Sequence, residues 1–251
     1  MTVKFEIQAA GKFKLSMSRI SKVTSNAIFT LYNHKYTINF EHGILENYGI
    51  NIVDGCVPNE GLSFVFSTIK FHNLFKNFKG GSSLLCSWDL KKNFVIKPIK
   101  KTIVRSEKFE KMTLKTTVKP VSEPKVENVL DEYFDFELLQ QETLPGSINL
   151  QQIIWTMEKL VQTFENVNLS FSNQNIKIYS ENDFYSCESN IEMITTSNIT
   201  NSIKVSSENL LNILWITEFT SDKAFIFVNP KTLQPCVAST CEDNNVFIMI
   251  R

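Results

Sequence analysis

The stretch that decides the fold occurs twice in the chain, as two versions of one strand–helix–strand pattern. Residues 61–78 read GLSFVFSTIKFHNLFKNF and residues 200–217 read TNSIKVSSENLLNILWIT, so the copies start 200 − 61 = 139 positions apart. Each copy begins with alternating apolar residues, as in a half-buried strand, and continues with the apolar spacing of an amphipathic helix. A new strand is expected after each helix, near 84–88 and 223–228. Two copies of one unit with little sequence identity predict two copies of one domain.

The elements predicted around these copies follow the same order in both halves. In the first half we expect a strand, a helix, further strands and the first copy, at 3–8, 12–25, 27–32, 35–40, 44–53, 61–88, 92–97 and 111–119. In the second half we expect the same series, with Ser147 as the N-cap of its first helix, at 133–139, 148–164, 167–172, 175–180, 184–193, 201–228, 234–239 and 245–250. Short turns between the strands favour antiparallel sheets with helices on one face, an α+β fold. The prolines and charges of 120–132 predict a connector between domains at 1–119 and 133–251.

Length and composition allow two domains and argue against a membrane protein. The chain has 251 residues, of which 43% are hydrophobic, enough for two domains of about 120 residues. The alternating N-terminus predicts a strand rather than a signal peptide, and no apolar run approaches the roughly 18 residues of a membrane span. Five cysteines without a Cys-x-x-Cys pair fit a reducing compartment, the nucleus or the cytosol.

The formal net charge of zero conceals an opposite charge on each half. Residues 1–119 contain 19 basic and 8 acidic residues (19 − 8 = +11), and residues 120–251 contain 7 basic and 18 acidic residues (7 − 18 = −11). A basic half indicates a polyanionic partner, most often nucleic acid. Two other interpretations are that the halves attract each other or that the charges form ordinary solvated surface.

The order of elements resembles the eukaryotic-type DNA sliding clamp over nearly the whole chain. Within it, residues 11–23 (GKFKLSMSRISKV) resemble the first helix of the Hus-type subunit of the checkpoint clamp. That subunit typically has Phe-Thr-Arg-Ile-Ser where Met17-Ser18-Arg19-Ile20-Ser21 stands here. The resemblance implies two tandem DNA-clamp domains, each with antiparallel sheets outside and two helices on the inner face of a ring.

The same resemblance implies a function. It implies a non-enzymatic subunit of a heterotrimeric ring, formed with two related clamp subunits, that encircles double-stranded DNA in the nucleus without reading its sequence. A clamp loader would place the ring at damaged or stalled DNA, where it would recruit checkpoint and repair proteins. We keep as an alternative a homotrimeric replication clamp or viral DNA polymerase processivity factor.

The helices of the first half carry cations opposite their apolar stripes. In the first helix, Phe13, Met17 and Ile20 form the stripe that faces the sheet. The predicted DNA-facing residues are Lys12, Lys14, Arg19, Lys22, Lys70, Lys76, Lys79 and Lys159. Cations at helical spacing suit phosphate contact without base reading, although an ordinary solvated helix face has the same pattern.

The helices of the second half carry few cations, which favours a heterotrimer over a homotrimer because other subunits could supply them. Trp155 and Trp215 lie off the apolar stripes of their helices. We expect both to be partly packed against a neighbour rather than to stack on bases.

The resemblance also implies how the ring closes, by pairing the last strand of domain one with an edge strand of domain two in the next subunit. These strands would be 111–119 and 184–193. Opposite charges on them would favour head-to-tail order, and the predicted interface residues are Lys111, Lys115, Lys119, Glu188 and Glu192.

No catalytic or metal-binding arrangement is recognisable in the sequence. The three histidines are scattered, and Cys236 and Cys241 have no second pair at zinc spacing. Neither a Walker-type phosphate loop nor a Gly-x-Ser-x-Gly motif occurs. We therefore expect no enzymatic activity, no metal and no cofactor. An enzyme or carbohydrate-binding protein built on two β-rich domains is the competing class.

Overall fold

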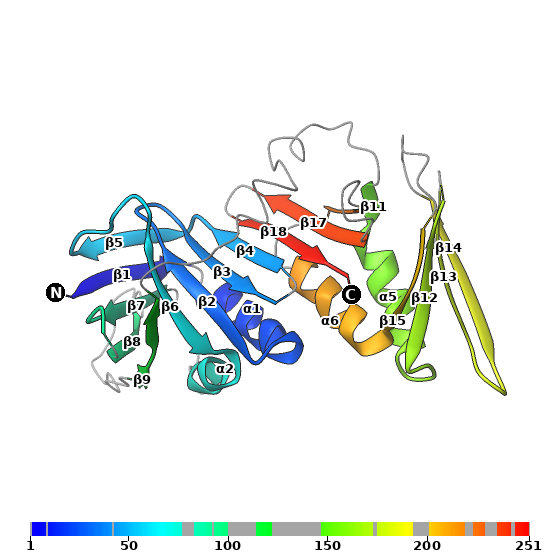
Figure 1. Ribbon diagram of the computed structural model, residues 1–251, viewed down its shortest axis with the longest axis horizontal. Coiled ribbons are helices and arrows are strands. Elements are labelled where there is room, and N and C mark those ends of the chain that lie inside the picture. Colours follow the sequence, from blue (N-terminus) through cyan, green and yellow to red (C-terminus); the bar gives the residue numbers. More distant parts are fainter. Residues whose placement is uncertain are drawn as a thin grey trace, which may run out of the picture. The chain divides into compact units, whose positions relative to one another are not determined.

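Two groups of elements, one from each half of the chain, form separate units in the computed structural model (Figure 1). The first unit comprises Met1–Glu41 and Leu45–Val126, and the second comprises His42–Ile44 and Glu127–Arg251. The structure describes residues 2–8, 10–41, 43–76, 83–91, 93–99, 114–121, 147–172, 175–192, 201–218, 223–228, 235–241 and 244–250. The connector expected at 120–132 lies outside these residues apart from its first two positions, so the domain boundaries stay a prediction.

Two sheets form the first unit. The strand β1 (Val3–Gln8) alternates as expected, with Val3, Phe5 and Ile7 buried. One sheet has the order β5-β1-β7-β8-β9, with β5 (Ile50–Asp54), β7 (Ser83–Trp88), β8 (Asn93–Ile99) and β9 (Leu114–Thr117). The other has the order β10-β6-β2-β3-β4, with β10 (Lys119–Val121), β6 (Leu62–Ser67), β2 (Asn26–Leu31), β3 (Tyr36–Phe40) and β4 (Gly43–Asn47).

Aromatic rings join the two sheets and two helices of the first unit into one core. The helices α1 (Ala10–Val23) and α2 (Thr68–Lys76) pack side by side (Figure 1). Rings from β1, β2, β6, β8 and both helices meet, with centroid distances of 5.9 Å for Phe5 and Phe29, 5.1 Å for Phe29 and Phe64, 5.1 Å for Phe64 and Phe94, 5.7 Å for Phe71 and Phe94, and 5.1 Å for Phe13 and Phe75. Each such pair adds about 0.5–1.5 kcal/mol beyond burial of its area.

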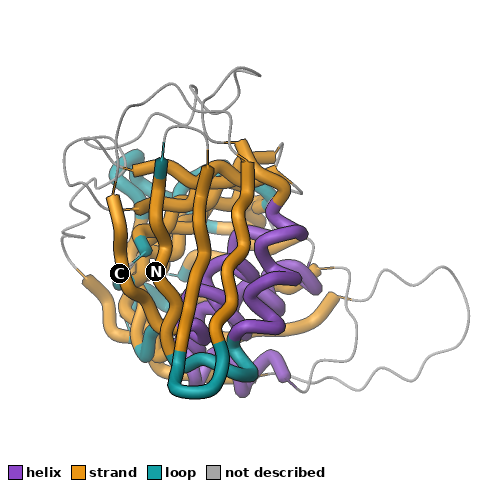
Figure 2. The backbone as a smooth tube through the Cα atoms, turned by 90° about the vertical axis from the view of Figure 1, so that its right-hand side faces the viewer, coloured by secondary structure: helices purple, strands orange, loops and turns teal. Residues whose placement is uncertain are grey.

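The second unit repeats this arrangement with a mainly aliphatic core. Its helices are α5 (Leu150–Leu160) and α6 (Ser207–Glu218), which pack side by side. One sheet has the order β14-β13-β12-β15, with β14 (Ser186–Glu192), β13 (Asn175–Glu181), β12 (Asn166–Phe171) and β15 (Asn201–Ser206), and its strands run side by side facing the viewer in Figure 2. Further strands have the order β18-β17-β16-β11, with β18 (Asn244–Met249), β17 (Pro235–Cys241), β16 (Lys223–Val228) and β11 (Ser147–Asn149).

Equivalent hydrogen bonds confirm the repeat that the sequence predicts. The first backbone N–H of α2, on Thr68, donates to the carbonyl of Ser25 at 3.1 Å, and that of α6, on Ser207, donates to the carbonyl of Glu165 at 2.9 Å. Met17 of α1 and Met157 of α5 are 157 − 17 = 140 positions apart, and both are completely buried. The two units therefore share their helix–sheet geometry despite different core residues.

The structure differs from the predicted elements at the start of α5 and within residues 44–53. Ser147 and Ile148 lie in β11, so Ser147 is not the expected N-cap and the helix begins later, at Leu150. The single strand expected at 44–53 is two strands, because the side-chain carbonyl of Asn47 accepts the N–H of Gly49 at 2.9 Å in a local turn. The strand expected at 133–139 lies outside the described residues.

Within the described part of the chain, no helix combines the length and the apolarity needed to cross a membrane.

Candidate nucleic-acid interface

The helix α1 presents a cationic face away from its sheet. Its buried residues are Ala10, Phe13, Ser16, Met17 and Ile20, and Phe13 packs edge-on against Tyr36 of β3 at 5.7 Å. Of the predicted DNA-facing residues, Lys12 and Lys22 are exposed, and Lys14 and Arg19 are half-buried. Lys14, Arg19 and Lys22 each also have an interaction partner within the chain. Lys12 and Lys22 are therefore the accessible cations of this helix.

The helix α2 adds one described cation beside α1. The ring of its buried Phe71 packs on that of Phe66 of β6, with the centroids 4.4 Å apart. The helix α1 packs on the same sheet. Lys70 of α2 is exposed. Because both helices bury one face against the same sheet, their opposite faces point away from it. Lys76 lies in the last turn but its side chain is not among those described, and Lys79 lies outside the described residues.

In the second unit, one cation lies on an exposed helix face together with an aromatic ring. The Nζ atom of Lys159 lies 3.3 Å from the centroid of the Trp155 ring. Trp155 is 60% exposed. Trp155 is therefore only partly packed, with Lys159 over its ring, and Trp215 of α6 is half-buried.

The helix α6 has almost no surface to offer to a ligand. Its sequence contains no Lys or Arg, and its residues 210–214 are all buried, as are Ile216 and Thr217. Glu208 and Asn209 are exposed at its start. The second unit can thus contribute little to phosphate binding through this helix, as its sequence indicates.

Three of the residues predicted to close a ring lie on two sheet edges. The strand β9 is the last strand of its sheet and contains Lys115, and β14 is the first of its sheet and contains Glu188 and Glu192. Glu188 is exposed but already contacts Lys177 at 2.8 Å, and hydrogen bonds from Lys177 and then Asn190 lower its pKa. The side chains of Lys115 and Glu192 are not described, and Lys111 lies outside the described residues.

The prediction of a single strand at 111–119 is wrong. Residues 114–117 form β9 against β8, whereas residues 119–121 form β10 against β6, in the other sheet of the first unit. Val118 between them is buried. Pro120 has no N–H to donate, which suits a strand at a sheet edge. Lys115 and the exposed Lys119 therefore lie on different strands.

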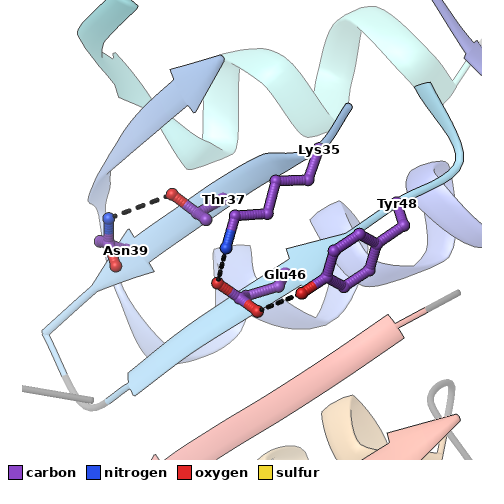
Figure 3. Close-up of polar contacts among 5 residues, drawn as sticks. All are labelled: Lys35, Thr37, Asn39, Glu46 and Tyr48. Atoms are coloured by element: carbon purple, nitrogen blue, oxygen red, sulfur yellow. Dashed lines mark hydrogen bonds and ion pairs between the residues drawn. The ribbon is translucent and has the colours of Figure 1, made fainter. Parts of the chain in front are cut away.

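A polar cluster of the first unit was not predicted from the sequence. Lys35 contacts Glu46 across the hairpin at 2.8 Å, and the hydroxyl of Tyr48 donates to the other oxygen of Glu46 at 3.2 Å (Figure 3). The Asn39 amide donates to the Thr37 hydroxyl nearby at 3.4 Å. Burial alone lowers the pKa of Lys35, but the hydrogen bond and charge of Glu46 outweigh it, so its pKa is raised above 10.5. The sequence does not reveal that Lys35 in a turn pairs with Glu46 in a strand, because their pairing depends on strand register.

Among the described residues, no group of three or more His, Cys, Asp and Glu side chains could hold a metal ion. Cys86 and Cys236 are buried free cysteines, and burial raises the pKa of the Cys86 thiol well above its usual range.

Comparison with known proteins gives one kind of match, to solved structures. No family model and no curated protein sequence matches the chain. PCNA from Thermococcus kodakaraensis is similar in structure, with a TM-score of 0.68 over 99% of this chain and 100% of that chain. Sequence identity is 9%, so the likeness is one of fold. The expectation of an α+β clamp fold is thereby confirmed: the chain has the fold of that PCNA.

Proposed function

We propose that the chain is a non-enzymatic subunit of a ring-shaped clamp that encircles duplex DNA without reading its sequence. The observation that carries this proposal is the cationic face of α1 and α2, with Lys12, Lys22 and Lys70 exposed, on a chain with the PCNA fold. Lysines on one helix face can follow a phosphate backbone and leave base edges untouched. Such contacts weaken with salt and permit sliding.

We further infer that the ring is the heterotrimeric checkpoint clamp and that this chain is its Hus-type subunit. The support is the sequence of residues 11–23 and the scarcity of cations on the second unit, where α5 has Lys159 alone and α6 has none. Two related subunits would then supply the remaining phosphate contacts. In this proposal the ring acts in the nucleus, requires a clamp loader, and recruits checkpoint and repair proteins.

Ring closure is proposed to join the edge strand β14 of one subunit to the edge strand β9 of the next. Edge strands present backbone N–H and C=O groups that pair readily with another chain. Since Glu188 already contacts Lys177 within its own sheet, we expect backbone pairing to contribute more to closure than a new ion pair at Glu188.

The test is retention on a circle. The complex that contains this chain is loaded on a nicked circular plasmid and passed over a sizing column, before and after the plasmid is linearised. A ring is expected to stay with the circle in moderate salt and to leave it once an end is cut. Equal retention on circular and linear DNA, or no retention on either, would contradict encirclement.

A homotrimeric replication clamp or viral processivity factor is the second candidate. The observation that favours it is the division of charge, with +11 on residues 1–119 and −11 on residues 120–251 as counted above. Copies of one chain could then associate head to tail through opposite charges. The mass of the purified chain in solution separates the candidates, because a stable homotrimer would contradict the heterotrimeric assignment.

A further inference from the structure

We propose that Trp155, with Lys159 beside it, is a stacking site for an unpaired nucleobase, so that the chain distinguishes single-stranded from fully paired DNA. This inference rests on the proposed function for the class of ligand, and it adds a site that duplex encirclement does not require.

The ring of Trp155 lies at the middle of the outward face of α5. Met157, two residues further on, is fully buried and lies roughly 200° round the helix at about 100° per residue. Ile153 and Leu160 are buried on the same side as Met157. The indole therefore points away from the core, in agreement with its exposure.

Lys159 lies over one side of the Trp155 ring, so a base would stack on the other side. It lies one turn after Trp155, and its ammonium group is 3.3 Å from the ring centroid, within cation–π range. One face of the indole is thus covered by a cation, while the exposed remainder can receive a flat ring. The same ammonium group lies where it can also attract the phosphate that accompanies a stacked base.

The surroundings of Trp155 suit a base better than a protein surface. From Gln151 to Leu160, where the burial of α5 is described, the other exposed residues are polar or charged: Gln151, Gln152, Glu158 and Lys159. An exposed contiguous apolar patch larger than a few hundred Å² commonly marks a protein docking surface. A single aromatic ring among polar side chains matches the way single-stranded nucleic acid is bound, one base per ring.

The first unit has the same arrangement without the ring. Leu15 of α1 is the counterpart of Trp155 (155 − 15 = 140), and Arg19 is the counterpart of Lys159 (159 − 19 = 140). Leu15 is 41% exposed, so both helices place a bulky apolar side chain on the outward face with a cation one turn later. Leucine cannot stack on a base, so the preference for unpaired DNA is assigned to the second unit alone.

The experiment compares two probes with the full-length chain at low salt. Fluorescence anisotropy measures binding to a 20-nucleotide oligo(dT) and to a 20-base-pair duplex. Trp155→Ala is expected to weaken oligo(dT) binding about 5- to 150-fold, the equivalent of 1–3 kcal/mol for one stacked base, and to leave duplex binding within about twofold. Trp155→Phe should keep most of the oligo(dT) affinity, because a smaller ring can still stack.

Two matched variants separate stacking from other effects. Leu15→Ala truncates the equivalent apolar residue of the first unit and should leave the ratio of the two affinities unchanged. Lys159→Gln should weaken both probes by a similar factor, because its contact is with phosphate. Circular dichroism verifies that each variant is folded.

Four outcomes would overturn the inference. If Trp155→Ala weakens both probes equally, or neither, the ring is not a stacking site. If it leaves both DNA affinities unchanged but abolishes co-purification of a protein, the ring is a protein contact. If the wild-type chain binds duplex but not oligo(dT), or binds neither probe, the inference fails, while the proposed function is tested separately by retention on the circular plasmid.

Discussion

At the scale of single residues, the least expected feature is the buried carboxylate of Glu46. Glu46 of β4 is 7% exposed, and burial of an unpaired carboxylate would destabilise the unit by several kcal/mol. Lys35 and Tyr48 each satisfy one of its oxygens, and the Lys35 ammonium also lies 5.5 Å and 5.7 Å from the rings of Tyr32 and Tyr48. The cluster therefore joins the turn between β2 and β3 to strand β4 and to Tyr48, which follows it.

Removing the lysine tests this account. Lys35→Met should lower the free energy of unfolding by about 1–3 kcal/mol, because it leaves Glu46 buried with one neutral donor. Lys35→Met combined with Glu46→Gln should recover part of that loss. Urea unfolding of the three proteins at neutral pH measures both effects. A double variant no more stable than Lys35→Met would show that the pair does not act as proposed.

The same cluster has a predicted pH dependence. Because the pKa of Lys35 is raised above 10.5 in the folded chain, its contribution to stability is complete below 10.5 and is lost as pH rises through the folded value. The stability difference between wild type and Lys35→Met should therefore be constant from neutral pH to about 10 and shrink above it.

At the scale of elements, the two copies begin their second helices in the same way. The hydroxyl of Ser67 accepts the N–H of Lys70 at 3.4 Å, and that of Ser206 accepts the N–H of Asn209 at 3.4 Å. Each serine ends a strand and caps the helix that follows, so it satisfies a donor that the helix itself cannot. The serines aligned by the sequence repeat thus have one structural role.

Both caps should respond alike to substitution. Ser67→Ala and Ser206→Ala are each expected to cost about 0.5–1 kcal/mol, at the low end for N-caps because both bonds are long. Hydrogen exchange should increase in the first turn of α2 for the former and of α6 for the latter. Ser202→Ala, an exposed serine of β15, serves as the control. Exchange that rises equally across the whole unit would indicate global destabilisation instead of a lost cap.

At the scale of the whole molecule, the opposite charges of the two halves predict different numbers of phosphate contacts from the two units. The exposed lysines on the helices of the first unit face away from its sheet, while the second unit contributes Lys159 on α5. Each lysine on a phosphate releases a counterion, so the salt dependence of binding counts these contacts.

The count gives a direct prediction. Changing Lys12, Lys22 and Lys70 together to Gln should reduce the slope of log affinity against log salt concentration by about 2.7, at about 0.9 per duplex phosphate contact. Lys97→Gln, which removes an exposed cation from β8, should leave the slope unchanged. Duplex binding measured between about 50 and 200 mM salt gives both slopes. A loss of about 0.9 in the control, the amount for one charge, would mean that DNA responds only to total charge.

The sequence by itself determined the α+β class, the duplicated strand–helix–strand unit, the buried stripe of α1 and the side of that helix on which the cations lie. These features follow from periodicity and self-similarity, which are local patterns in the chain. The tertiary structure alone decided that residues 114–121 divide between two sheets, that Glu46 is buried against Lys35, and that Trp155 is exposed. Each of these depends on which distant segments meet, and neither spacing nor composition records strand register or the depth of a side chain.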